Sequence, residues 1–210
     1  ARTAFIDLLQ NREYSLHDRL VNVLSASSEI QYALDGEDTK EIKAIAQELS
    51  HPEIIAERVE SLKKALPEKP LENAENMLLY LERLDFIGDI LPQQIKDASR
   101  FVKKLSAPLK AQTSGEYEKL AVYFVYRYFL KAVRDFDLLS KIKAMIVFVF
   151  AAEVINLSRE QDAHARFETV KELCKEIEYS GDNMDRIYDD SYLSDIFSDT
   201  SMLALLEWTL

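Results

Sequence analysis

Two consecutive stretches of the chain are apolar on almost every face of a helix. The first, EYEKLAVYFVYRYFLKAV, covers residues 116–133, and the second, KIKAMIVFVFAAEVINL, covers residues 141–157. A helix that is hydrophobic all round must be buried in a large core or in a membrane. A membrane span needs about 20 apolar residues, whereas Arg127 interrupts the first stretch and Glu153 interrupts the second. The pattern therefore predicts a buried helical hairpin and no membrane insertion.

The rest of the chain shows helical periodicity and no convincing strand. Only four glycines and five prolines occur, and they fall between the periodic segments, as expected where helices begin and end. Helices are predicted over residues 3–11, 16–34, 37–49, 53–66, 72–86, 92–110, 115–134, 138–157 and 159–178. Shorter helical turns are predicted near residues 182–188, 192–197 and 201–208. The prediction is thus an all-α fold, a bundle-like arrangement of about nine main helices around the buried hairpin.

Two steps in the chain resemble capping boxes, in which a serine caps a helix and an acidic or amide residue follows three positions later. They are Ser15 with Asp18, and Ser158 with Gln161. Each precedes an amphipathic run, so each is expected to mark the start of a helix.

The length of 210 residues suits one sizeable hydrophobic core. We therefore expect a single helical domain over residues 1–210. Residues 1–113 are expected to form a more polar, peripheral half, and residues 114–210 are expected to form the buried half and the C-terminal turns. Because the chain does not begin with Met, we also expect it to be a piece of a longer cytoplasmic protein.

The positions of charges within the hairpin predict an ion pair. One face of its first helix carries Tyr117, Leu120, Ala121, Phe124 and Tyr128, and another carries Tyr123, Arg127, Leu130 and Arg134. If the two helices pack antiparallel, Glu153 of the second helix can face Arg127. Two interpretations are open: a buried structural ion pair, or a clamp for an anion or a carboxylate in a pocket.

Composition excludes several classes of site. The net charge of -11 argues against nucleic-acid binding, because phosphate binding needs clustered lysine and arginine. A single cysteine, Cys174, excludes a disulfide framework and a cysteine-only metal site, and its apolar neighbours on the helix predict a core residue. Glu48 and His51 have the Glu-x-x-His spacing of di-iron helices but lack the second pair. No metal site is therefore predicted in this chain.

Three further segments carry a recognisable order of residues. The first, after the opening TAFIDLLQNREY, consists of Ser15, Leu16, Arg19 and Leu20. The second consists of Tyr117, Glu118, Val122, Phe124, Tyr126 and Arg127. The third consists of Ile177, Glu178, Tyr179 and Ser180. Together they resemble the C-terminal region of the flagellin lysine-N-methylase family, in which a histidine is typical where this chain has Tyr179.

The resemblance implies the C-terminal part of a protein-lysine N-methyltransferase that methylates flagellin lysines using S-adenosylmethionine. It implies substrate binding and a contribution to the active site, with flagellin as the protein partner. It also implies a second partner, the family's own N-terminal cysteine-rich part, which is expected to hold an iron-sulfur or other metal centre. This chain lacks that cysteine cluster, so activity is expected to need the missing part.

The polar residues within the matched segments are the candidates for catalysis: Glu118, Tyr123, Arg127 and Glu178. A substrate lysine must be delivered neutral, so a carboxylate, a tyrosine or a desolvated channel must accept its proton. Aromatic faces also stabilise a sulfonium or a methylated amine. No residue is assigned to the cofactor. The alternative hypothesis is a non-catalytic all-helical protein-interaction module whose polar half binds a partner helix.

Overall fold

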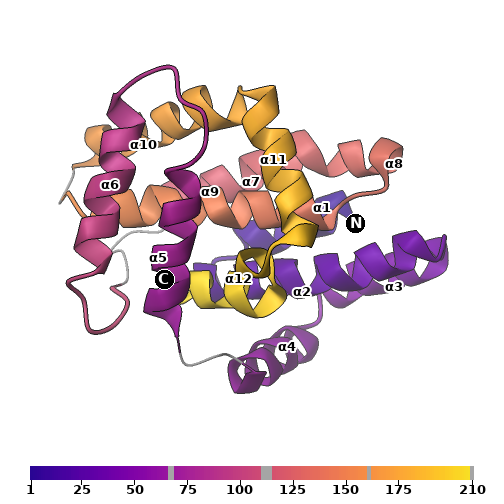
Figure 1. Ribbon diagram of the computed structural model, residues 1–210. Helices are drawn as coiled ribbons and strands as arrows, with labels where there is room; N and C mark the ends of the chain where they lie inside the picture. The colour runs from indigo at the N-terminus through magenta and orange to yellow at the C-terminus, as the bar shows by residue number, and fades with distance from the viewer. Residues whose placement is uncertain (66–68, 110–114, 160–161, 209–210) are drawn as a thin grey trace.

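The computed structural model describes residues 1–65, 69–109, 115–159 and 162–208. Within these ranges every regular element is a helix, so the predicted all-α fold is confirmed (Figure 1). The division of the chain into a polar and a buried half stays a prediction. None of the described helices is long and apolar enough to cross a membrane.

The helices follow one another along the chain. In chain order they are α1 (Arg2–Gln10), α2 (Leu16–Asp35), α3 (Thr39–Glu48), α4 (Pro52–Ala65), α5 (Pro70–Leu81), α6 (Ile90–Val102), α7 (Gly115–Tyr128), α8 (Ala132–Asp135), α9 (Leu139–Leu157), α10 (Ala163–Leu173), α11 (Gly181–Leu193) and α12 (Asp199–Leu206). Three short turns complete the set: 3-10 turns at Phe129–Lys131 and Asp195–Phe197, and a π turn at Cys174–Glu178.

The central element is α9, which is buried from Ser140 to Asn156. It is rich in isoleucine and valine, which are only moderate helix formers, so packing by its neighbours is what stabilises it. Helices α2, α6, α7, α10, α11 and α12 all pack against it. Figure 1 shows α9 crossing the molecule, with α10 and α11 on one side and α2 and α12 on the opposite side.

Helices α7 and α9 form the predicted antiparallel hairpin. Phe124 and Phe148 pack against each other near the middle, with ring centroids 4.6 Å apart and the rings tilted by 47°. The amide of Asn156, near the end of α9, donates a hydrogen bond of 3.1 Å to the hydroxyl of Tyr117, near the start of α7. The prediction that α7 is buried on nearly every face is wrong, because Tyr126 is 66% exposed. One side of α7 therefore faces solvent.

The predicted element boundaries differ from the observed ones where the backbone changes its winding. The segment predicted as one helix over 115–134 ends as α7 at Tyr128, and the chain continues through a 3-10 turn into α8. Phe136 closes α8 in the left-handed region, with φ of 56°. Only a short turn was predicted where α11 forms a helix of 13 residues.

The two predicted capping boxes have different outcomes. The Ser15 side chain accepts a hydrogen bond of 3.0 Å from the backbone N–H of Asp18, which confirms the first start signal. The second is wrong, because Ser158 lies at the C-terminal end of α9 and α10 begins at Ala163. There the carboxylate of Asp162 is the cap. Gln161 lies outside the described residues.

Candidate functional site

A buried carboxylate lies where α10 widens into a π turn. The turn spans Cys174–Glu178, and the side chain of Glu178 at its end has no exposed surface. A π turn adds a residue to the helical turn and often occurs at functional sites. Here it directs Glu178 toward α7, where polar side chains donate hydrogen bonds to its carboxylate.

Two tyrosine hydroxyls and one arginine meet the same oxygen of Glu178. Tyr123 and Tyr128 each donate a hydrogen bond of 2.6 Å to Oε1, a length typical of charge-assisted bonds to a carboxylate. The Nε of Arg127 lies 3.1 Å from this oxygen and donates to the Tyr128 hydroxyl at 3.1 Å. The four side chains form what we call the Glu178 cluster.

Aromatic rings surround the guanidinium of Arg127. Its central carbon lies 5.9 Å from the ring centroid of Tyr123, 5.5 Å from that of Tyr128 and 5.8 Å from that of Tyr179. These distances fall within the range of cation–π attraction. The cation is therefore held by three ring faces and one buried carboxylate.

The groups around Glu178 are held in their protonated forms. Burial, followed by the hydrogen bond to Glu178, raises the pKa of Tyr123 and of Tyr128. Burial, followed by the interaction with Glu178, also raises the pKa of the Cys174 thiol to about 12. At neutral pH both tyrosines are therefore hydrogen-bond donors, and the thiol is a weak nucleophile.

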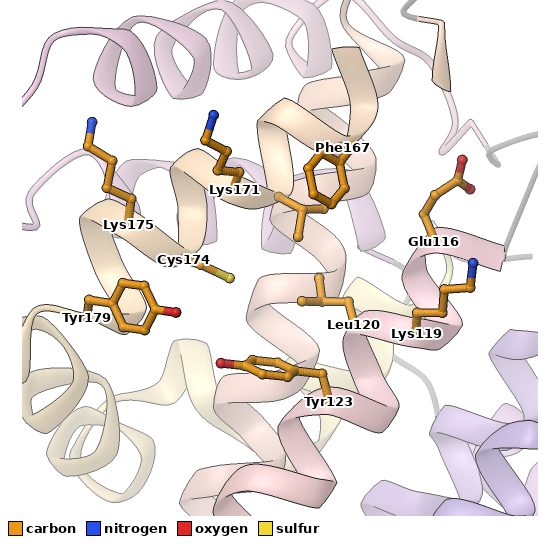
Figure 2. Close-up of a pocket in the computed structure, with 10 residues that line it drawn as sticks. Glu116, Lys119, Leu120, Tyr123, Phe167, Lys171, Cys174, Lys175 and Tyr179 are labelled. Carbon is orange, nitrogen blue, oxygen red and sulfur yellow. The ribbon is translucent and has the colours of Figure 1, made fainter. Parts of the chain in front are cut away.

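An open groove of about 760 Å³ lies beside the cluster (Figure 2). Apolar and aromatic side chains line it, with charged groups at its rim: Glu116, Lys119, Leu120, Tyr123, Phe167, Val170, Lys171, Cys174, Lys175 and Tyr179. Figure 2 shows the Tyr123 and Tyr179 hydroxyls pointing toward one another below Cys174. Cys174, predicted to be a core residue, is only partly buried and lines this groove.

The structure brings three of the four predicted catalytic residues together, because Tyr123, Arg127 and Glu178 all belong to the Glu178 cluster. The predicted pairing of Arg127 with Glu153 is wrong. Arg127 lies on the solvent side of α7 and meets the carboxylate of Glu178, whereas Glu153 is buried in α9. The error concerns the faces of α7: Tyr117 and Phe124 meet α9, whereas Arg127 is directed toward the π turn that carries Glu178.

The fourth candidate, Glu118, lies in a separate ionic cluster. Arg12 of the α1–α2 connection contacts both of its carboxylate oxygens, at 3.0 and 3.1 Å. Arg19 of α2 adds a bond of 2.8 Å. The arginine hydrogen bonds outweigh burial and lower the pKa of Glu118. Arg19 also donates to the backbone carbonyl oxygens of Leu9 and Ser15, so this cluster joins α1, α2 and α7.

The three segments that carry the resemblance therefore meet in space. Arg19 of the first segment bonds Glu118 of the second, and Arg127 of the second contacts Glu178 of the third. Residues far apart in the chain are thus paired through their charges.

The four catalytic candidates chosen from the sequence leave out two members of the site, Tyr128 and Tyr179. Tyr128 was assigned to the apolar face of α7, where its ring is indeed buried. A buried tyrosine hydroxyl usually needs a partner, and this requirement was the available signal. Tyr179 is 67% exposed, and it reaches Arg127 only because the π turn ends beside α7.

The described residues contain no group of three or more histidine, cysteine, aspartate or glutamate side chains that could hold a metal ion. Glu48 bonds Arg58 at 2.7 Å. His51 is exposed and lies 3.6 Å from Glu53. The Glu-x-x-His spacing therefore corresponds to a surface ion pair and a helix boundary.

A family model described as the FliB lysine N-methylase C-terminal domain matches residues 2–205. The chain belongs to this family. No curated protein and no solved structure matches the chain significantly. In this FliB C-terminal domain, the three segments that carry the resemblance are in contact at the Glu178 cluster and at the Glu118 cluster.

The Glu118 cluster is expected to be structural. Arg19→Met leaves Glu118 buried with one arginine fewer, and removing a partner from a buried ion pair costs about 3–5 kcal/mol. The free energy of unfolding, measured with urea, should fall by that amount. Arg100→Met is the matched control, since Arg100 pairs with Asp97 but is 67% exposed, and it should cost less than about 1 kcal/mol. Equal losses would contradict the assignment.

Cys174 is expected to react slowly. With a thiol pKa of about 12, alkylation by iodoacetamide at pH 8 should be at least about 100-fold slower than for free cysteine. The rate should keep rising between pH 7 and 10, because the thiol titrates above this range. The urea-unfolded chain serves as the control and should react like free cysteine. A rate plateau near pH 8.5 in the folded protein would contradict the raised pKa.

Proposed function

We propose that this domain binds the substrate lysine in the methylation of flagellin by a FliB-type enzyme. The observation that carries the proposal is the Glu178 cluster together with Tyr179, because a buried carboxylate and three tyrosine rings already hold a cation there. The family assignment supports lysine N-methylation as the reaction. Flagellin as the substrate and the cytoplasm as the location belong to the proposal.

The chemistry of the transfer suits such a cluster. Lysine has a reference pKa near 10.4 and must lose a proton before its nitrogen can attack a methyl group. Glu178 is the acceptor within reach of a cation at this place, and Tyr123 and Tyr128 fix its position by donating to Oε1. The apolar groove wall fits the four-carbon stem of a lysine side chain.

We propose S-adenosylmethionine as the methyl donor, but the described groove does not fit it. Ribose hydroxyls are commonly bound by an acidic side chain. The one carboxylate among the groove residues, that of Glu116, is already bonded to Arg166 at 2.8 Å. We therefore assign no residue of this chain to the donor. The N-terminal cysteine-rich part, with its iron-sulfur or other metal centre, stays a prediction.

The acidic character of the chain supports encounter with a lysine-bearing protein. A net charge of -11 favours association with a basic surface, mainly through the association rate and with strong dependence on salt.

The proposal is tested by mixing the chain with flagellin and with labelled S-adenosylmethionine and measuring the binding of each. Flagellin should bind, and Glu178→Gln should weaken this binding about tenfold or more, because a hydrogen bond to a charged group contributes about 1.5–3 kcal/mol. Tyr128→Phe, which removes one donor to Glu178, should weaken it in the same direction. Circular dichroism checks that each variant is folded.

Glu72→Gln is the matched control, because Glu72 is an exposed carboxylate on α5 that pairs with Lys69. It should bind flagellin as the wild type does. Flagellin binding that is unaffected by Glu178→Gln and Tyr128→Phe would contradict lysine binding at the Glu178 cluster. It would favour the non-catalytic interaction module.

A further inference from the structure

We propose that the side chain of Arg127 occupies a binding site for a ligand cation. Its guanidinium occupies a cage built for an alkylammonium ion, and a lysine ammonium entering along the groove displaces it. The cage consists of the rings of Tyr123, Tyr128 and Tyr179 and the carboxylate of Glu178. The choice of lysine as the ligand rests on the proposed function.

The cage has the composition that recognises organic cations. Three electron-rich ring faces lie 5.5–5.9 Å from the guanidinium carbon, and aromatic cages of this kind bind quaternary and methylated ammonium groups. The buried carboxylate of Glu178 supplies the opposite charge and excludes anions. Methylation leaves the amine cationic, so the same cage suits the substrate and its methylated products.

Arg127 fills this cage incompletely. It approaches Glu178 through Nε alone, and the second carboxylate oxygen, Oε2, is buried without a hydrogen-bond partner among the described residues. A guanidinium normally pairs with a carboxylate through two parallel bonds. The Cys174 thiol, whose pKa is raised by burial and by Glu178, is only a weak donor beside this carboxylate. Glu178 therefore keeps acceptor capacity for a stronger donor, such as an ammonium ion with its three N–H groups.

The Glu118 cluster provides an internal comparison. There Arg12 contacts both carboxylate oxygens although its side chain is 71% exposed, and Arg19, whose side chain is 3% exposed, adds a further bond. Arg127, 47% exposed, approaches a single oxygen of Glu178. The two clusters therefore differ in how completely arginine engages the carboxylate, which is complete at Glu118 and incomplete at Glu178. The second arrangement is the one that a competing cation can replace.

The groove leads to the cage. Tyr123 and Tyr179 belong to both, and Figure 2 shows them at the end of the groove below Cys174. Leu120 and Val170 line the adjoining wall, so the methylene stem of a lysine lies against apolar surface while its ammonium reaches the rings.

The test measures the affinity of the 210-residue chain for Nα-acetyl-lysine methylamide by calorimetry. Removing the internal competitor by Arg127→Gln should tighten binding about tenfold or more, because the free cage is then always available. Arg127→Met serves as a second variant that keeps the aliphatic stem. Arg100→Gln, an exposed arginine paired with Asp97, is the matched control and should change nothing. The uncharged glutamine analogue should not bind.

The results separate this inference from the proposed function. Tighter binding of the lysine analogue by both Arg127 variants, lost again on adding Glu178→Gln, supports the cage even where flagellin fails to bind. Unchanged or weaker binding by folded Arg127 variants overturns the displacement of Arg127, even where flagellin binding depends on Glu178. A sulfonium shares the relevant chemistry, so S-adenosylmethionine is measured in parallel. A gain in its affinity and none for the lysine analogue would also overturn the proposal.

Discussion

The fold depends on covering one helix that has no solvent face. Because α9 is buried from Ser140 to Asn156, apolar surface must meet it on every side, and α2, α6, α7, α10, α11 and α12 supply that surface. Polar groups near both ends of α9 bond its neighbours: Lys141 pairs with Asp135 of α8 at 2.9 Å, and Asn156 bonds Tyr117 of α7. Hydrophobic burial thus determines which helices become adjacent.

The functional chemistry lies on the outer side of this packing. Helix α7 packs one face on α9. Tyr123 and Arg127 lie on another face and are directed toward α10 and its π turn. The extra residue of that turn brings Glu178 beneath the two tyrosine hydroxyls and leaves Tyr179 at the surface. A buried core and a half-open cation cage are therefore two consequences of the same helix pairing.

The sequence predicted the parts of the structure that depend on local pattern. The all-round apolar run at 141–157 predicted α9, and the polar residues of the resembling segments included Tyr123, Arg127 and Glu178. The pairing of Arg127 with Glu178 could not be predicted, because a π turn leaves no periodic trace. The prediction that Glu153 faces Arg127 failed because Arg127 lies on the solvent side of α7. The role of Tyr128 was hidden because its ring is a core side chain and only its hydroxyl belongs to the site.

The displacement of Arg127 can be observed directly by following its Nε–Hε resonance by NMR. In the free protein this N–H is bonded to the Tyr128 hydroxyl beside Glu178 and should give a slowly exchanging signal, which Arg127→Gln identifies by its absence. Saturation with Nα-acetyl-lysine methylamide should shift the signal and abolish its protection from solvent exchange. A signal that keeps its position and its protection in the saturated complex would contradict the account.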